Sequence, residues 1–389
     1  MHRTSSSLWL ALALGLVVTG CNRDQFTPSD PAATPQNGLA ADRESGDDGE
    51  EDLPFTYAVI GDFPYGAVKR SEMPFLVDLI NADPDVERVL HAGDIKSGSN
   101  SDCSNAYFDD IRGQFDRFQD PLVYTPGDNE WTDCHVTFKN NGLYTPTERL
   151  ARVRQVFFPV PGRTLGVNSR RVVSQAQVDP ANGAYLENTM WKRSNVVFAS
   201  INITGSDNDK APWTSTPVQA GELPADFASY PSQAEEQASR TRATRAWIDR
   251  TFTLATREHA PAVVLLFQAD MWDGTLANRT TTIDGYDDIV IQIGTLAAKF
   301  GRPVLLLMGD SHVFRVDQPY SPSSPLFELH PNTPVAPNVT RLVTNGSSSR
   351  TEYVRLVIDP RLARRGQTPW TFTEVPLIMP ATAVAMRSN

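Results

Sequence analysis

The chain has too few basic residues for a nonspecific nucleic-acid binder. Its 389 residues include 35 Lys and Arg against 46 Asp and Glu, a formal net charge of −11. Binding to a phosphate backbone needs a basic surface, which this balance argues against. Residues 22–52 alone carry a net −7, and the rest of the chain is only mildly acidic. With 40% hydrophobic residues and 18 Phe the chain is not fully disordered.

Long hydrophobic runs are also scarce at the N-terminus. The apolar run Leu8–Val18 is shorter than the roughly 20 residues that a membrane span requires, and it suits the central region of a secretory signal. The run ends in Val-Thr-Gly-Cys at Cys21, which resembles the bacterial lipobox. We therefore expect a signal peptide over 1–20 and lipidation of Cys21, with a plain signal peptide as the alternative.

The expected location follows from this signal. Residues 21–52 are rich in small and acidic residues and read as a disordered tether, and 53–389 as the folded domain. We expect an exported lipoprotein of the bacterial cell envelope that touches the membrane through its lipid anchor alone. By resemblance to Gram-negative sorting rules, Asn22 after the cysteine favours sorting to the outer membrane or a periplasm-facing location.

Cysteine is rare, with three residues in the chain. Because export places Cys103 and Cys134 in an oxidising compartment, a disulfide between them is the default expectation. A metal-binding thiolate pair is the alternative, disfavoured because neither cysteine belongs to a C-x-x-C spacing.

Short apolar segments alternate with helical patterns along the folded part. Strands are predicted at Phe55–Ile60, Arg88–His91, Pro121–Tyr124, Asn195–Ile203, Ala262–Phe267, Arg302–Met308, Arg341–Thr344 and Tyr353–Ile358. Helices are predicted at Ser71–Asn81, Gln233–Ala255 and Asp284–Lys299. This alternation indicates an α/β protein. The polar stretches 161–190 and 204–230 read as surface insertions, and nothing demands a second domain.

Four of these strands lead into the dipeptide Gly-Asp, which supplies Asp62, Asp94, Asp128 and Asp310. Ligand sites of open α/β sheets form outside the carboxyl ends of the strands, so we expect these side chains to share one crevice. A single such Asp would be an ordinary turn or helix-cap residue. Four carboxylates together repel one another, and a divalent cation relieves that repulsion.

His312 follows Asp310 by two residues. If the extended geometry persists, both side chains lie on one side and form a ligand pair. The alternative is a satisfied loop histidine, but the neighbouring Gly-Asp turns favour the ligand.

The motif order G-D-x-x (61–64), G-D-x-x-x-G (93–98), G-D-N-E (127–130), Q-A-D (268–270) and G-D-S-H (309–312) resembles that of calcineurin-like metallophosphoesterases. The resemblance implies a four-layer α/β/β/α sandwich of two mixed sheets and hydrolysis of phosphomonoesters or phosphodiesters by a metal-activated hydroxide. It assigns the following metal ligands: Asp62, Asp94, Asp128, Gln268, Asp310 and His312.

Several family positions differ in this chain. Pro64 stands where the first motif has histidine, and Asn129 takes the place of the catalytic histidine. Gln268 and Asp310 replace two imidazoles, so the site becomes oxygen-rich. Oxygen ligands favour Mn²⁺, Mg²⁺ or Ca²⁺ over Zn²⁺ or iron, and we expect one or two cations.

Another group must then assist the leaving group of the substrate. The candidates are Asn129, His91 and His135, although both histidines could equally be structural. For substrate binding we consider Asn129 and Arg315, with a structural Arg315–Asp317 pair as the alternative for the arginine.

Two other functions stay open. The loss of the motif histidines suits a decayed phosphoesterase that binds a ligand or metal in the envelope without turnover. A structural lipoprotein stabilised by Ca²⁺ is a third hypothesis. The substrate and the oligomeric state are not encoded in any motif that we identify.

Overall fold

The computed structural model describes residues 52–99, 102–135, 144–210, 213, 231–273 and 283–379. All of them belong to one compact unit, Ala40–Asn389. The predicted signal peptide 1–20, Cys21 and the tether up to residue 51 lie outside the described residues. No helix in the described ranges has the length and apolar character that a membrane crossing requires.

A five-stranded mixed sheet has the order β12-β11-β1-β2-β3. Its strands are β1 (Phe55–Ile60), β2 (Val86–His91), β3 (Leu122–Tyr124), β11 (Glu352–Ile358) and β12 (Trp370–Pro376). β1, β2 and β3 are parallel neighbours, whereas β11 pairs antiparallel with both β1 and β12. The carboxyl ends of β1, β2 and β3 therefore open at one edge.

The second sheet has seven strands in the order β4-β5-β6-β7-β8-β10-β9. They are β4 (Val173–Ser174), β5 (Thr189–Arg193), β6 (Val196–Ser200), β7 (Val263–Leu266), β8 (Val304–Met308), β9 (Arg315–Asp317) and β10 (Val339–Val343). The central β6-β7-β8-β10 run is parallel, and the outer strands are antiparallel. β7 and β8 are buried throughout, in keeping with their continuous apolar sequences.

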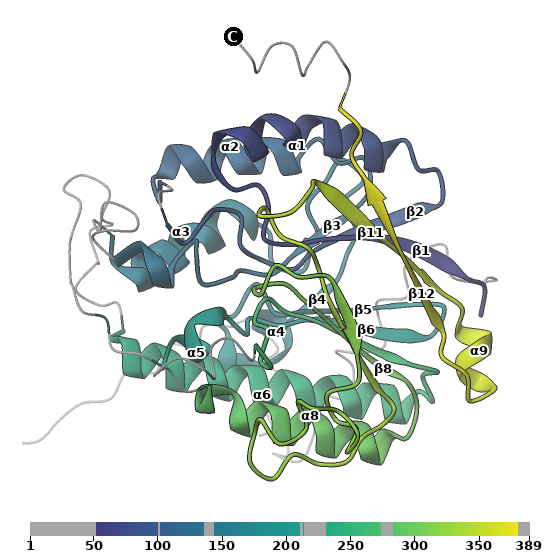
Figure 1. Cartoon of the computed structure of the whole chain (residues 1–389). Helices are drawn as coiled ribbons and strands as arrows, with labels where there is room; N and C mark the ends of the chain where they lie inside the picture. The colour runs from purple at the N-terminus through teal and green to yellow at the C-terminus, as the bar shows by residue number, and fades with distance from the viewer. Residues whose placement is uncertain are drawn as a thin grey trace, which may run out of the picture. The chain divides into compact units, whose positions relative to one another are not determined.

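Long helices pack on each sheet (Figure 1). Their bounds are α1 (Gly66–Asn81), α2 (Asn105–Phe115), α3 (Pro146–Phe157), α6 (Gln233–Arg257) and α8 (Asp287–Phe300). The shorter helices are η1 (Thr132–His135), α4 (Gln175–Val178), η2 (Pro180–Asn182), α5 (Gly205–Asp209), η4 (Asp284–Tyr286) and α9 (Pro360–Arg364).

Among the described residues, three large hydrophobic clusters form most of the core, and a small fourth one surrounds Cys103 and Cys134. One joins α1, α2 and α3 to the five-stranded sheet through residues such as Leu76 and Phe108. A second joins α6 and α8 to the seven-stranded sheet through Trp247 and Ile293. The third holds side chains of both sheets, among them Tyr57 and Phe198, whose rings lie 5.3 Å apart. The protein is thus a mixed α/β structure with two mixed sheets, compatible with an α/β sandwich.

The apolar runs predicted the central strands well, and the edges less well. β4, β5 and β12, and the helices α2 and α3, were not predicted. The stretch 161–190, predicted as a surface insertion, instead contains β4 and the start of β5. Buried side chains such as Val173 and Met190 attach it to the sheet. α1 begins at Gly66, one turn before the predicted Ser71.

Candidate functional site

The polar residues predicted at the strand ends come together. Asp62, Asp94 and Asp128 follow β1, β2 and β3, while Gln268 and Asp310 follow β7 and β8. The Gln268 side chain of one sheet donates to Asp94 Oδ2 of the other at 3.1 Å. The Asp310 N–H donates to both Asp62 carboxylate oxygens, at 3.0 and 2.9 Å. The crevice therefore lies where the ends of the two sheets meet.

Asp94 is held at the centre of this crevice and is only 2% exposed. Asn129 contributes two donors, its backbone N–H to Asp94 Oδ1 at 3.1 Å and its side-chain amide to Oδ2 at 2.8 Å. Asp128 accepts a hydrogen bond from the Ser206 hydroxyl at 2.6 Å. The Asp94 carboxylate is thus held by the loop after β3, and the Asp128 carboxylate by α5.

The glycines of the Gly-Asp dipeptides provide space for these carboxylates. A Cβ on Gly127 would lie 1.9 Å from Asp94 Oδ1, and one on Gly309 would lie 2.0 Å from Asp62 Oδ2. Of the Gly residues in the four dipeptides, Gly93 has a positive φ, +89°. The change of backbone direction after these strands therefore occurs mainly at the aspartates and not at the glycines.

Left-handed backbone conformations cluster among the site residues. The φ angles are +50° at Asp62, +57° at Asp94, +71° at Asp310 and +61° at His312. Non-glycine residues rarely adopt this region, and such strain concentrates at functional sites. Three of the four Gly-Asp aspartates and His312 therefore share one left-handed backbone conformation just after the strands end.

The carboxylates disturb one another's ionisation. Burial raises the pKa of Asp94 well above its usual range, and Asp128, Glu130, Asp62 and Asp310 raise it further. The pKa of Asp310 is also raised well above its usual range by burial and then by Asp128 and Asp62. Without positive charge, the site retains protons that isolated carboxylates would lose.

His312 joins the cluster at its exposed side. Its Nε2 lies 3.3 Å from Asp62 Oδ1, and its Nδ1 lies 3.4 Å from the Ser348 hydroxyl. Burial lowers the pKa of this histidine, but the hydrogen bond and the charge of Asp62 outweigh burial and raise the pKa. Asp310 and His312 both lie near Asp62, but their φ angles of +71° and +61° show that the extended geometry assumed in the spacing argument does not persist.

Tyr65 is a site residue that the sequence did not reveal. Its hydroxyl lies 3.3 Å from Asp62 Oδ1, 3.1 Å from Asp94 Oδ2 and 3.4 Å from His312 Nε2. The Asn129 amide donates to the same hydroxyl at 2.9 Å. Burial, followed by the charges of Asp94 and Asp62, raises the pKa of Tyr65 well above its usual value. A tyrosine directly after the motif position held by Pro64 was the one signal available.

A second unforeseen element is the left-handed turn Ser206–Asp209 within α5. Its four residues have φ between +53° and +56°, a conformation that costs roughly 1–2 kcal/mol per non-glycine residue. The buried guanidinium of Arg240 holds the turn through the side chain and carbonyl of Asn208. Gly205, next to the turn, donates its N–H to Gln268 Oε1 at 2.6 Å. The turn thereby positions both Gln268 and Asp128.

Three predicted residues lie outside this cluster of contacts. His91 is buried, with Nε2 2.9 Å from the Phe63 carbonyl oxygen and Nδ1 accepting the Gly93 N–H at 3.2 Å. Burial lowers its pKa to about 4, so the ring is a neutral support for the two loops. His135 Nδ1 lies 2.8 Å from the Thr132 carbonyl within η1. Arg315 begins β9, and its suggested partner Asp317 is bound instead by Arg341.

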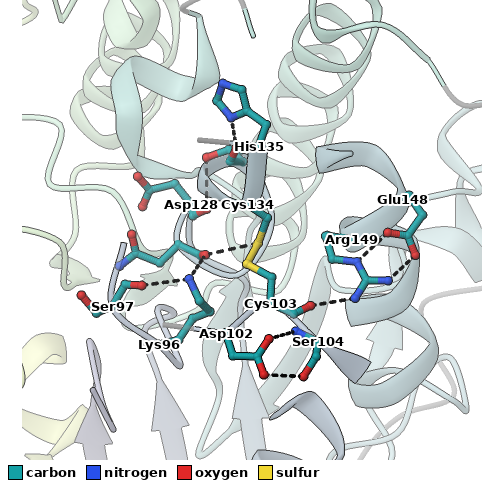
Figure 2. Close-up of a disulfide and its surroundings, with 12 residues drawn as sticks. Lys96, Ser97, Asp102, Cys103, Ser104, Asp128, Cys134, His135, Glu148 and Arg149 are labelled. Atoms are coloured by element: carbon teal, nitrogen blue, oxygen red, sulfur yellow. Dashed lines mark hydrogen bonds and ion pairs between the residues drawn. A yellow bond between two sulfur atoms is a disulfide. The ribbon is translucent and has the colours of Figure 1, made fainter. Parts of the chain in front are cut away.

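The predicted disulfide between Cys103 and Cys134 is confirmed. It fastens the segment before α2 to η1 (Figure 2). The Cys134 sulfur lies 3.7 Å from the Asn129 carbonyl oxygen. Beside it, the buried Lys96 ammonium donates to the carbonyls of Ser97 and Asn129, both at 2.8 Å. Burial lowers the pKa of Lys96 to about 8, against the opposing charges of Asp133 and Glu130. The loop that carries Asn129 is therefore cross-linked and hydrogen-bonded.

The site fits a divalent cation in donor type and charge, though not as a preformed cage. Asp62 and Asp94 are almost fully buried and Asp128 is 7% exposed. Oxygen donors of this kind suit Mg²⁺, Mn²⁺ or Ca²⁺. Within the described ranges, no group of three or more His, Cys, Asp or Glu is already arranged to hold a metal. The Tyr65 hydroxyl lies between the candidate ligands as they stand.

Comparisons with known proteins give fold likeness only. No family model and no curated protein matches the sequence. Among solved structures, the protein is similar to GAP50, the anchor in the inner membrane complex of Plasmodium, with 8% identity over 86% of this chain and 94% of that one, at a TM-score of 0.39. It is also similar to the Thermus thermophilus sulfate thiohydrolase SoxB in complex with glycerol, with 14% identity over 82% of this chain and 46% of that one, at a TM-score of 0.36. Likeness at this level assigns neither a family nor an activity.

Proposed function

We propose that the protein is a metal-dependent hydrolase of phosphomonoesters or phosphodiesters. The observation that carries this proposal is the meeting of Asp62, Asp94, Asp128 and Asp310 from the two sheets, with the pKa values of Asp94 and Asp310 raised by their neighbours. Buried carboxylates in such numbers lower the stability of a fold, so their convergence needs a compensating positive charge. One or two divalent cations would supply it.

The ligand assignment is the one that the motif resemblance implies. Asp62 and His312 would hold a first cation, Asp94 would reach both positions, and Asp128, Gln268 and Asp310 would hold a second. Gln268 is the weakest of these, because its oxygen already accepts the Gly205 N–H. When bound, such cations activate a water molecule and neutralise phosphoryl charge. The oxygen-rich donor set favours Mn²⁺, Mg²⁺ or Ca²⁺.

Asn129 is the residue of this chain best placed to contact the substrate. Its side-chain amide, 8% exposed as a residue, already donates to both Asp94 and Tyr65. Once a cation is bound to the carboxylates, this amide would be free to donate to a phosphoryl oxygen and orient the ester. An amide N–H is too weak an acid to protonate a leaving alkoxide, so we assign Asn129 to binding and leave protonation to solvent.

The order of the layers in the fold is also part of this proposal. The helical clusters on the outer faces of the two sheets and the shared cluster between the sheets support a four-layer α/β/β/α order. Together with the motif order, that arrangement supports descent from calcineurin-like metallophosphoesterases.

We also propose that the protein is held in the bacterial envelope through Cys21, which labelling with a radioactive fatty acid in wild type and Cys21→Ala would test.

The second candidate is an envelope protein that binds a ligand or a cation without turnover. Tyr65 favours it, because the phenol is inserted among the carboxylates where an open catalytic site would hold water. The absence of a histidine at position 129 points the same way. This candidate predicts cation binding with no hydrolysis under any metal.

The test is hydrolysis of aryl phosphomonoesters and phosphodiesters with Mn²⁺, Mg²⁺, Ca²⁺ and Zn²⁺ in turn. We expect activity with Mn²⁺ or Mg²⁺ that falls at least about a hundredfold in Asp94→Asn. Asp288→Asn is the matched control, since that carboxylate is exposed on α8 and pairs with Arg245. Equal activity in wild type and Asp94→Asn would overturn the proposal, and metal binding without any turnover would favour the second candidate.

A further inference from the structure

A pocket lies at the opposite end of the sheets from the crevice. Pro303 and Asn338 line it and directly precede β8 and β10, whereas Asp310 follows β8. Since a strand rises about 3.3 Å per residue, Pro303 and Asp310 lie roughly 20 Å apart. The pocket is therefore separate from the candidate metal site.

Both sheets contribute to this pocket. Arg364 of α9 and Trp370 at the start of β12 come from the five-stranded side (Figure 1). Gln318 after β9 and Thr340 of β10 come from the seven-stranded sheet. The cavity volume is about 590 Å³, which is typical of sites for organic small molecules and far more than one inorganic ion fills.

The charged side chains that line the pocket are both basic. They are Arg302 and Arg364, and the lining contains no Asp or Glu, although the chain as a whole has a net charge of −11. Arg364 is paired with Asp52 through two hydrogen bonds. Arg302 donates to the Ala260 carbonyl at 2.8 Å and has no carboxylate partner among the described residues. The Arg302 guanidinium is therefore the cation that a bound anion would meet.

Trp370 adds a buried hydrogen-bond donor to the pocket wall. The residue is 7% exposed, and its indole N–H makes no hydrogen bond to any residue that the structure describes. A buried donor without a partner costs free energy, which an acceptor oxygen of a ligand would offset. Charged oxygens are the strongest such acceptors. Pro261 and Pro303 supply apolar wall beside the indole.

We propose that this pocket binds an organic oxyanion, a small molecule with a carboxylate or phosphate group on an apolar body. Arg302 pairs with the charged group, the Trp370 N–H donates to one of its oxygens, and the prolines contact the apolar body. The guanidinium fork matches carboxylate and phosphate alike, so the two groups share one recognition chemistry. This inference does not depend on the proposed function, because it needs no cation in the crevice.

The test follows the indole N–H signal of Trp370 by NMR in isotope-labelled protein without added metal. Trp370→Phe identifies that signal by its loss. The probes are naphthoate, phenylphosphonate and inorganic phosphate at constant ionic strength, each added up to about 10 mM, so that even millimolar affinity is detected. We expect naphthoate or phenylphosphonate to shift the signal saturably, and inorganic phosphate to bind more weakly than either.

Two arginine variants test the charged contact. Arg302→Gln should bind the organic probes about tenfold or more weakly, because it loses the charge-assisted hydrogen bonds. Arg242→Gln is the matched control, since that exposed guanidinium donates to the Ser239 hydroxyl on the same helix, α6, and it should bind as wild type does. Near-UV circular dichroism checks the fold of both variants.

The wild-type titration decides the proposal even if Arg302→Gln does not fold. A Trp370 signal that none of the three probes shifts would overturn the proposal. Inorganic phosphate that binds as tightly as the organic probes would overturn the organic part of it. Equal binding of the organic probes by wild type and a folded Arg302→Gln would overturn the role of Arg302, whereas binding lost in Arg302→Gln and kept in Arg242→Gln would support it.

Discussion

The backbone N–H of Asp310 donates to both carboxylate oxygens of Asp62, at 3.0 and 2.9 Å. Asp62 follows a strand of the five-stranded sheet and Asp310 follows a strand of the seven-stranded sheet. A charge-assisted hydrogen bond of this kind is stronger than a neutral one. The two sheets are thus joined at the edge where the candidate site lies, and the site depends on that junction.

Gly309→Ala should break this junction. The added Cβ would lie 2.0 Å from Asp62 Oδ2, so Asp62 must move, and we expect a loss of about 1–3 kcal/mol in the free energy of unfolding. Gly113→Ala is the control, since nothing lies within 4 Å of a Cβ at this position in the last turn of α2; it should gain up to about 0.5–1 kcal/mol. Urea unfolding of both variants measures the difference, and equal stabilities would contradict the close approach.

His91 should make the protein acid-sensitive. Its folded-state pKa of about 4 lies below the ordinary value of 6.5. Between those pH values the unfolded chain binds a proton that the folded chain excludes, so stability rises with pH there and is lost on acidification. The loss reaches at most about 3 kcal/mol.

The measurement is urea unfolding across that pH window in wild type, His91→Gln and His259→Asn. We expect the stability of His91→Gln to vary less with pH than that of wild type. His259 is exposed, and its variant should keep the wild-type slope. A His91→Gln profile parallel to wild type would show that folding does not lower the pKa of His91.

Two substitutions at Ser206 separate backbone strain from hydrogen bonding. Ser206 has a φ of +55° and donates to Asp128. Both Ser206→Ala and Ser206→Gly lose the hydroxyl, but glycine adopts this conformation without strain. We expect Ser206→Gly to be more stable than Ser206→Ala by about 1–2 kcal/mol in thermal or urea unfolding. Equal stability of the two variants would place the turn outside the left-handed region.

Asp270 should be structural despite its place in the motif region. Its carboxylate is fully buried, contacts the Arg341 guanidinium at 2.5 Å, and its N–H donates to Asp310 Oδ2. Asp270→Asn leaves the buried guanidinium of Arg341 without the negative charge of Asp270. We therefore expect a loss of about 3 kcal/mol or more in the free energy of unfolding. The exposed Asp288→Asn should change the free energy of unfolding by less than about 1 kcal/mol. Equal losses of stability in the two variants would mean that the Asp270–Arg341 ion pair is exposed to solvent.

The parts of the site that follow from strand order were predictable from sequence. Parallel strands of one sheet end at one edge, so the residues after β1, β2 and β3 had to lie near one another. Local periodicity was sufficient for these residues because each directly follows an apolar run. Asp310 follows β8 of the other sheet, and its place beside Asp62 depends on how the two sheets pack. The spacing of Asp310 and His312 was no guide, because both residues have left-handed backbone.

Tyr65 and Ser206 were not predictable in this way. Tyr65 reaches the site because Ser347, 282 residues later, accepts its N–H, and no local pattern encodes that contact. Ser206 depends on Arg240 holding a left-handed turn that its own sequence disfavours. His91 was named for its nearness to Asp94 in sequence, but its ring points to the backbone of the neighbouring loop.

The central claim is that the crevice between the two sheets holds a divalent cation. The most direct measurement is the anomalous difference density of a crystal soaked in Mn²⁺. The account predicts a manganese peak within ligand distance of Asp94, with Asp62 and His312 around it or with Asp128 and Asp310 around a second peak. A well-ordered crystal without any peak in this crevice, with the Tyr65 hydroxyl still between Asp62 and Asp94, would contradict it.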